Sequence, residues 1–282
     1  MVKGKCWKLT IMLAVAGLAG LLAAAPSEIS VDLSLDNNDY VCGERIRGVV
    51  RIDNSSPREI SVGGSNSTDR LIVEVFRESD RSQLQKISNG SFTGRFRLKN
   101  GQGQRLEVRL GDHYGLRDPR RYLARPVLIH HGMRYEGAFR AFDVVAGLKC
   151  GEALQMFSNR SGLEREFQLA YWNRGGGTHL FLLASDTGTS RRQWHTKDLG
   201  RYMKLGRAPT VSILPNGEII TIHRHDADNF MRNEFWSLSD DLVFRGRTLI
   251  GDPETANQSR VREIFKESGG VKAKENPWWK FW

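Results

Sequence analysis

The sequence holds few cysteines and lacks the short motifs that anchor several common chemistries. Only 3 of its 282 residues are cysteine, too few for a disulfide-rich scaffold. No Gly-x-Ser-x-Gly elbow occurs, and neither does a Gly-x-x-x-x-Gly-Lys-Ser/Thr loop or a Gly-x-Gly-x-x-Gly loop. The sequence therefore contains none of these motifs for serine hydrolase or nucleotide-dependent chemistry. We assign no catalytic residue and no cofactor-binding residue.

The chain is also poor in long apolar runs, with one near its start. Three lysines precede a run from Leu9 to Leu22, and three alanines ending at Ala25 follow it. A basic start, a short apolar middle and small residues at the end are typical of a secretory signal peptide. The run has about 14 apolar residues where a membrane span needs about 20, which argues against a retained anchor. We expect cleavage near Ala25 and a periplasmic or secreted protein.

The chain carries a net positive charge, but its basic residues are not concentrated in one segment. Loss of the leader removes three lysines and no acid, so the formal net charge falls from +10 to +7. Such a protein can attract anionic glycans, lipid headgroups or nucleic acid through a sequence-independent Coulomb term. No recognition-helix pattern and no zinc-finger spacing favours specific nucleic acid binding. Arginines spaced by two and four predict a solvated strand face; they are Arg45, Arg47, Arg51, Arg95, Arg97, Arg105 and Arg109.

Two cysteines remain after removal of the leader, Cys42 and Cys150. Neither has the close cysteine or histidine partner of a zinc knuckle or a redox motif. An even pair in an oxidising compartment is more often bridged than free, so we predict a Cys42–Cys150 disulfide. Two unpaired thiols are the alternative.

The segment 26–147 has the pattern of an antiparallel β-sandwich. Ile29, Val31, Leu33 and Leu35 alternate with polar residues, which is typical of a half-buried strand. About seven strands with short turns fit a sandwich. The further strands are expected at 46–52, 71–76, 92–98, 106–110, 122–129 and 135–145, with turn-forming residues between them.

This segment resembles bacterial immunoglobulin-like modules. The resemblance is carried by Gly43-Glu44, by Asn54-Ser55-Ser56 and by Asp118-Pro119-Arg120-Arg121-Tyr122. It implies that Tyr122 ties a corner together, and that Cys42 and Cys150 lie at the same pole. The sequence departs from antibody domains because it lacks paired core cysteines with a tryptophan between them.

A linker is expected at 148–165 and a smaller β-rich unit at 166–251. Gly175-Gly176-Gly177 and Pro215-Asn216-Gly217 predict hairpin turns in that unit. Ser185-Asp186-Thr187-Gly188 followed by Trp194 is similar to the turn of sialidase-type propeller blades, and Ser239-Asp240-Asp241 before Phe244 is a weaker second match. About 85 residues supply two blades where a closed propeller needs four, so we expect a small open sheet.

The sequence ends in a predicted helix at 252–270 and a basic aromatic tail at 271–282. Asp252 and Pro253 suit the first positions of a helix, and Gly269-Gly270 suits its end. The tail can dock on the protein's own sheet, remain unfolded, or contact a membrane surface or partner. Its aromatic residues are Trp278, Trp279, Phe281 and Trp282.

One pattern could hold a metal. His223 and His225 stand two apart on a predicted strand, so both rings project from one face. Candidates for the third ligand are Asp228, Asp226 and His195. Zinc is the metal that such a set would take. The alternative is an exposed polar face, because Ile220 and Ile222 occupy the other side of the strand.

The chain is thus expected to be mostly β: an immunoglobulin-like sandwich, a smaller β-sheet domain and a C-terminal helix. A non-catalytic binding or assembly role in the cell envelope fits best, with a protein or an anionic glycan as partner and peripheral membrane contact through the tail as a further option. Two alternatives remain open. One is a metal-dependent periplasmic hydrolase that uses His223, His225 and an aspartate, and the other is a module that docks or inhibits a protease.

Overall fold

The structure, a computed structural model, describes residues 28–63, 68–156, 164–187, 194–238 and 242–251. These residues are mostly β, with eighteen strands and one short 3-10 turn, η1 (Leu110–Asp112). The expected leader, the expected helix at 252–270 and the aromatic tail lie outside the described residues. In the described part of the chain, no helix is both long and apolar enough to cross a bilayer.

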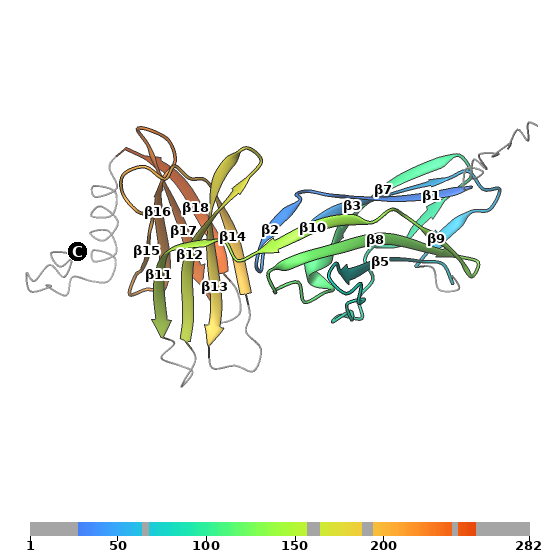
Figure 1. The fold of residues 1–282 in the computed structure, drawn as a ribbon, viewed down its shortest axis with the longest axis horizontal. Coiled ribbons are helices and arrows are strands. Elements are labelled where there is room, and N and C mark those ends of the chain that lie inside the picture. The colour runs from blue at the N-terminus through green and yellow to red at the C-terminus, as the bar shows by residue number, and fades with distance from the viewer. Residues whose placement is uncertain (1–27, 64–67, 157–163, 188–193, 239–241, 252–282) are drawn as a thin grey trace, which may run out of the picture.

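The first half of the chain forms a β-sandwich (Figure 1). One layer has the strand order β1-β3-β7, and the facing layer has the order β2-β10-β8-β5 with β9 paired to β8. A two-stranded sheet, β4-β6, adds to the same core. The bounds are β1 Ile29–Leu35, β2 Asp39–Val41, β3 Arg47–Asn54, β4 Ile60–Val62, β5 Arg70–Arg77, β6 Phe96–Leu98, β7 Gln102–Arg109, β8 Arg120–His130, β9 Met133–Glu136 and β10 Arg140–Val145.

Strict alternation in the sequence places the core residues of this sandwich. Val31 and Leu33 of β1 point inward, as do Val50 and Ile52 of β3, while the residues between them face outward or lie half-buried. The seven arginines predicted on a solvated face are all exposed. Tyr122 donates its hydroxyl to the carbonyl oxygen of Asp118 at 3.2 Å, which confirms the predicted corner contact.

The second half forms another sandwich, made of two four-stranded antiparallel sheets. Gly175 and Gly176 have φ of +56° and +80° and make the predicted tight turn. One sheet contains β11 Leu148–Met156, β12 Glu164–Arg174, β13 Gly177–Thr187 and β14 Trp194–Arg201, and the other contains β15 Thr210–Ile213, β16 Glu218–Arg224, β17 Phe230–Ser237 and β18 Leu242–Ile250.

Two sequence-based expectations differ from this arrangement. The expected linker at 148–165 holds strand β11, which pairs with β12 as part of the second sandwich. Of the residues compared with a propeller turn, Ser185, Asp186 and Thr187 lie in strand β13, whereas residues 188 and 239–241 lie outside the described residues. Asp186 lies within β13, where its carboxylate accepts two hydrogen bonds from the buried guanidinium of Arg165.

The predicted disulfide is wrong, because both cysteines are free thiols. Cys42 packs into the core of the first sandwich, whereas Cys150 packs against the core of the second. The sulfur of Cys150 lies 3.5 Å from the carbonyl oxygen of Leu169. The prediction assumed that Cys150 ends the last strand of the first sandwich, but β11 belongs to the other one.

One end of the first sandwich, at β2, meets the outer face of the β11-β12-β13-β14 sheet of the second (Figure 1). Val41 at the end of β2 packs among Ala170, Phe181 and Leu183 of the second sandwich. The Oγ1 of Thr196 donates to the backbone carbonyl oxygen of Cys42 at 2.6 Å. A buried apolar contact and a buried hydrogen bond therefore hold the sandwiches together.

Two polar side-chain pairs extend this junction. The indole nitrogen of Trp172 donates to Asp39 at 2.7 Å, and Arg174 donates to both carboxylate oxygens of Glu44. Asp39 begins β2 and Glu44 follows it, whereas both donors lie on β12. These directional polar contacts fix the orientation of one sandwich relative to the other.

Candidate functional site

A cleft lies at one lateral edge of the second sandwich. Strands β11 and β15 contact each other and close the opposite edge. Between the other two edge strands, β14 and β18, a cleft of about 470 Å³ remains. Its lining residues are Lys197, Asp198, Phe235, Phe244 and Arg247.

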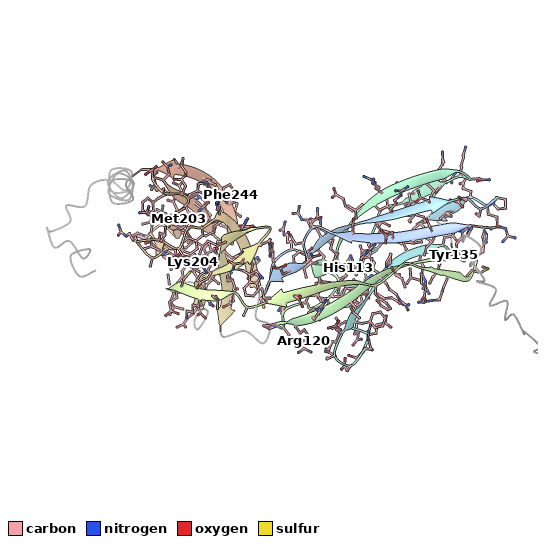
Figure 2. The ribbon with its side chains drawn as sticks, turned by 45° about the horizontal axis from the view of Figure 1, so that its top comes forward. His113, Arg120, Tyr135, Met203, Lys204 and Phe244 are labelled. Carbon is pink, nitrogen blue, oxygen red and sulfur yellow. The ribbon has the colours of Figure 1, made fainter. Side chains whose placement is uncertain are left out.

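The cleft has an aromatic floor and an aromatic rim. Phe235 of β17 is buried in the sandwich core. Phe244 of β18, labelled in Figure 2, is 48% exposed. Its ring lies edge-on to that of Phe235, with ring centroids 5.5 Å apart. A bulge between Glu234 and Phe235 sets Phe244 directly opposite Phe235. The bulge therefore keeps a large apolar side chain at the cleft mouth.

Arg247 bridges the mouth of the cleft. Its Nε donates to the side-chain oxygen of Asn233 at 2.7 Å, and its Nη2 donates to the backbone carbonyl oxygen of Asp198 at 3.2 Å. Asn233 is fully buried and donates in turn to the hydroxyl of Thr221 at 3.3 Å. A chain of polar groups thus runs from the cleft mouth into the sandwich.

His223 lies in this polar part of the interior and is 1% exposed. Its ring meets the ring of Tyr202 edge-on, with centroids 6.3 Å apart. Neither ring nitrogen has a partner of good hydrogen-bond geometry in the described part of the chain. Burial lowers the pKa of His223 to about 4, a backbone group of Arg201 acts in the opposite direction, and the charges of His225 and Arg247 lower it further. The imidazole is therefore neutral at pH 7.

The expectation that this histidine lies on an exposed polar face is wrong. Ile220 and Ile222 pack into an apolar cluster on one side of β16, and Ile219 packs into the core on the other. Both faces of β16 are buried, one against the sandwich core and the other against Leu214 and Phe230.

The structure does not assemble the predicted metal ligands. His225 follows the end of β16, and its backbone nitrogen donates to the carbonyl oxygen of Asn229. Asp228 is exposed in the same turn, where Asp226 accepts its backbone N–H at 3.0 Å. Across the described ranges, no group of three histidine, cysteine or acidic side chains is arranged to hold a metal.

Two polar pairs in the first sandwich were missed by the sequence analysis. The Oγ of Ser88 lies 2.7 Å from Nδ1 of His113, and burial lowers the pKa of His113 (Figure 2). Nδ1 of His130 lies 2.8 Å from Asp69. Burial alone would raise the pKa of Asp69, but hydrogen bonds from His130 and two backbone N–H groups hold it below its ordinary value. No local spacing signals either pair, because their members stand 25 and 61 residues apart.

Comparison with known proteins identifies no family. No family model and no curated protein matches the chain. Among solved structures, the alkylpurine DNA glycosylase AlkC of Pseudomonas fluorescens, bound to DNA with an abasic site analog, is 17% identical with a TM-score of 0.28. That match covers 42% of this chain and 31% of the glycosylase.

Two other solved structures match over more of the chain. The sporulation control protein Spo0M of Bacillus subtilis is 12% identical with a TM-score of 0.31, over 85% of this chain and 97% of that one. A DUF4784 family protein of Bacteroides caccae is 7% identical with a TM-score of 0.19, over 79% and 71% of the two chains. Likenesses this low carry no argument about the fold or the function of this chain.

Proposed function

We propose that this is a secreted or periplasmic bacterial protein with a non-catalytic binding or assembly role in the cell envelope. The leader pattern that ends at Ala25 supports the location. The binding role is supported above all by one observation, the exposed apolar edge strand β18. In this proposal the first sandwich is an immunoglobulin-like module, which the corner contact of Tyr122 supports.

Strand β18 is the last strand of its sheet in the described part of the chain. Three of its large apolar side chains are exposed, Val243 by 37%, Phe244 by 48% and Leu249 by 52%. An unpaired strand edge offers backbone N–H and C=O groups to another strand, and a contiguous exposed apolar patch marks an interaction site. At β18 an open strand edge and three exposed apolar side chains lie beside the cleft, with Val243 and Phe244 on opposite faces of the sheet.

The charges on β18 select the kind of partner. Arg245 and Arg247 flank Gly246. If two copies paired antiparallel about Gly246, each Arg245 would face an Arg247, and like charges directly opposite each other are destabilising. A strand from another protein, with a carboxylate opposite one of these arginines, has no such penalty. The proposed ligand is therefore an extended, acidic protein segment that adds to β18.

Site-specific photocrosslinking in envelope extracts tests this proposal. A Leu249→p-benzoylphenylalanine variant places the reactive group on β18, and an Ile87→p-benzoylphenylalanine variant places it on a side chain that is 66% exposed in the first sandwich. The proposal predicts a defined protein adduct at position 249 and none of the same mass at position 87. Absence of an adduct at 249, or identical adducts at both positions, would contradict it.

A further inference from the structure

Two arginine pairs face each other directly on the outer surface of the first sandwich. The register of β3 and β7 sets Arg47 opposite Arg109, and Arg51 opposite Arg105. All four side chains are exposed. Like charges directly opposite each other on a sheet destabilise it, so two such pairs on one face need a reason other than folding stability. We name these four residues the arginine ladder.

Three members of the ladder lack a counter-charge. Arg51 forms an ion pair with Asp53 at 2.9 Å. Arg47, Arg105 and Arg109 form no ion pair with any other residue of the described ranges. Asp32, which lies opposite Arg51 on β1, is already paired with Arg140 at 2.8 Å. One carboxylate, Glu107, lies between the two pairs, so the ladder keeps a net positive charge.

Protection of a sheet edge does not account for this arrangement. Charged residues on an edge strand prevent unwanted pairing, and that explains arginines on β7. However, Arg47 and Arg51 lie on β3, the middle strand of the order β1-β3-β7, whose backbone is already paired on both sides. A cationic face that spans two strands is better suited to an anion placed over the sheet.

The spacing of the pairs indicates a polymer. The pairs are four residues apart along each strand, which is about 13 Å at 3.3 Å per residue. One sulfate or carboxylate group cannot contact both, whereas a chain of such groups can. The three strands contain no aromatic residue, so the face offers no platform on which nucleic acid bases could stack. Guanidinium groups bind sulfate and carboxylate through paired hydrogen bonds without such stacking.

From these observations we infer that the arginine ladder binds an acidic polysaccharide. This site lies on the first sandwich and does not depend on the proposed role of β18. The polymer would lie over β3 and β7 and run along the strands, with one anionic group near Arg47 and Arg109 and another near Arg51 and Arg105. Binding of this kind releases counterions, so its affinity falls steeply with salt.

The test compares two variants of equal net charge for binding to heparin, a sulfated polysaccharide. One carries Arg47→Gln, Arg105→Gln and Arg109→Gln. The control carries Arg58→Gln, Arg81→Gln and Arg95→Gln, which are exposed arginines of the same sandwich outside the ladder. Dissociation constants are measured by calorimetry at several salt concentrations, after equal melting temperatures show that both variants are folded.

We expect the ladder variant to lose affinity roughly ten-fold or more, and its slope of log affinity against log salt to fall by about 2 to 3. The control should change that slope by less than about 1. Equal losses in both variants would show that net charge alone drives binding and would overturn the inference. So would tighter, ladder-dependent binding of a single-stranded 20-mer DNA, which would assign the face to nucleic acid.

Discussion

Arg174 donates to both carboxylate oxygens of Glu44, at 2.7 Å and 2.6 Å, across the boundary between the two sandwiches. The guanidinium also lies 5.8 Å from the ring centre of Tyr40 and 5.1 Å from that of Phe181. Burial alone would lower the pKa of Arg174, but the hydrogen bonds and charge of Glu44 raise it above its ordinary value. A bidentate pair between aromatic rings fixes both distance and orientation, so it stiffens the junction.

The first prediction concerns this pair. Glu44→Gln keeps the shape of the side chain but leaves the buried charge of Arg174 without its partner. We expect the free energy of unfolding to fall by about 3 kcal/mol. Glu59→Gln is the control, because Glu59 lies 3.9 Å from Arg97 in an exposed pair and should cost less than about 1 kcal/mol. Equal losses in chemical denaturation would show that the junction does not depend on the Glu44 pair.

A second buried ion pair joins two strands of one sheet in the second sandwich, and its arginine also donates to the backbone beyond the facing sheet's strand β17. Arg165 of β12 is 0% exposed; it donates to Asp186 of β13 at 2.5 Å and 2.9 Å, and to the carbonyl oxygen of Leu238 beyond β17 at 2.6 Å. We expect Asp186→Asn to destabilise the protein by about 3 kcal/mol, because it removes the carboxylate charge that accepts two hydrogen bonds from a buried guanidinium. Asp118→Asn, in an exposed pair with Arg120, is the control. A melting temperature unchanged by Asp186→Asn would refute this role.

The free energy of unfolding should depend on pH through the protonation of His223. Its pKa is about 4 in the folded protein and about 6.5 in an unfolded chain. Between these values the unfolded chain binds a proton that the folded protein does not, so stability falls as the pH drops from 6.5 to 4. The expected loss is about 3 kcal/mol.

His223→Leu should remove that part of the pH dependence, whereas replacement of the exposed His131 by Gln should leave it intact. Urea denaturation between pH 7 and pH 4 measures the difference. If His223→Leu and the parent protein lost the same stability over this range, His223 would have to be protonated in the fold.

The two free thiols give a prediction about redox conditions. Burial raises the pKa of Cys150 to about 11 and also raises the pKa of Cys42. Both thiols should therefore react slowly with an aromatic disulfide reagent in the native protein and rapidly in denaturant. Addition of a reductant should leave the melting temperature unchanged. A fall of several degrees on reduction would show a disulfide that the structure does not contain.

The sequence predicts most of the local structure, because local structure depends on near neighbours. Alternation in 29–35 marks β1, and the glycines at 175–177 mark the turn between β12 and β13. Strand β14 and the pairing of β11 were not predicted. A register shift between Lys149 and Gly151 interrupts the pairing of β11, and its place is fixed by β12, whose partner residues lie up to 23 positions away.

The candidate site was harder to predict than the fold. A pattern of Thr221 and His223 opposite Ile220 and Ile222 is typical of a half-exposed strand, yet the structure buries both sides of β16. Hydrogen bonds explain in part why polar residues are buried here. Asn233 donates to the hydroxyl of Thr221, and Arg247 donates to the side-chain oxygen of Asn233. Such partners come from other strands, so periodicity within one strand cannot reveal them.

The central claim is that the edge strand β18 binds a partner segment. Amide hydrogen exchange of β18 is the most direct test of that claim. The measurement compares the free protein with its photocrosslinked complex, residue by residue, by nuclear magnetic resonance. The account predicts slower exchange of the outward backbone amides within Leu242–Ile250, with no change at β7, the last strand of the β1-β3-β7 sheet. Unchanged exchange along β18 in the complex would contradict the account.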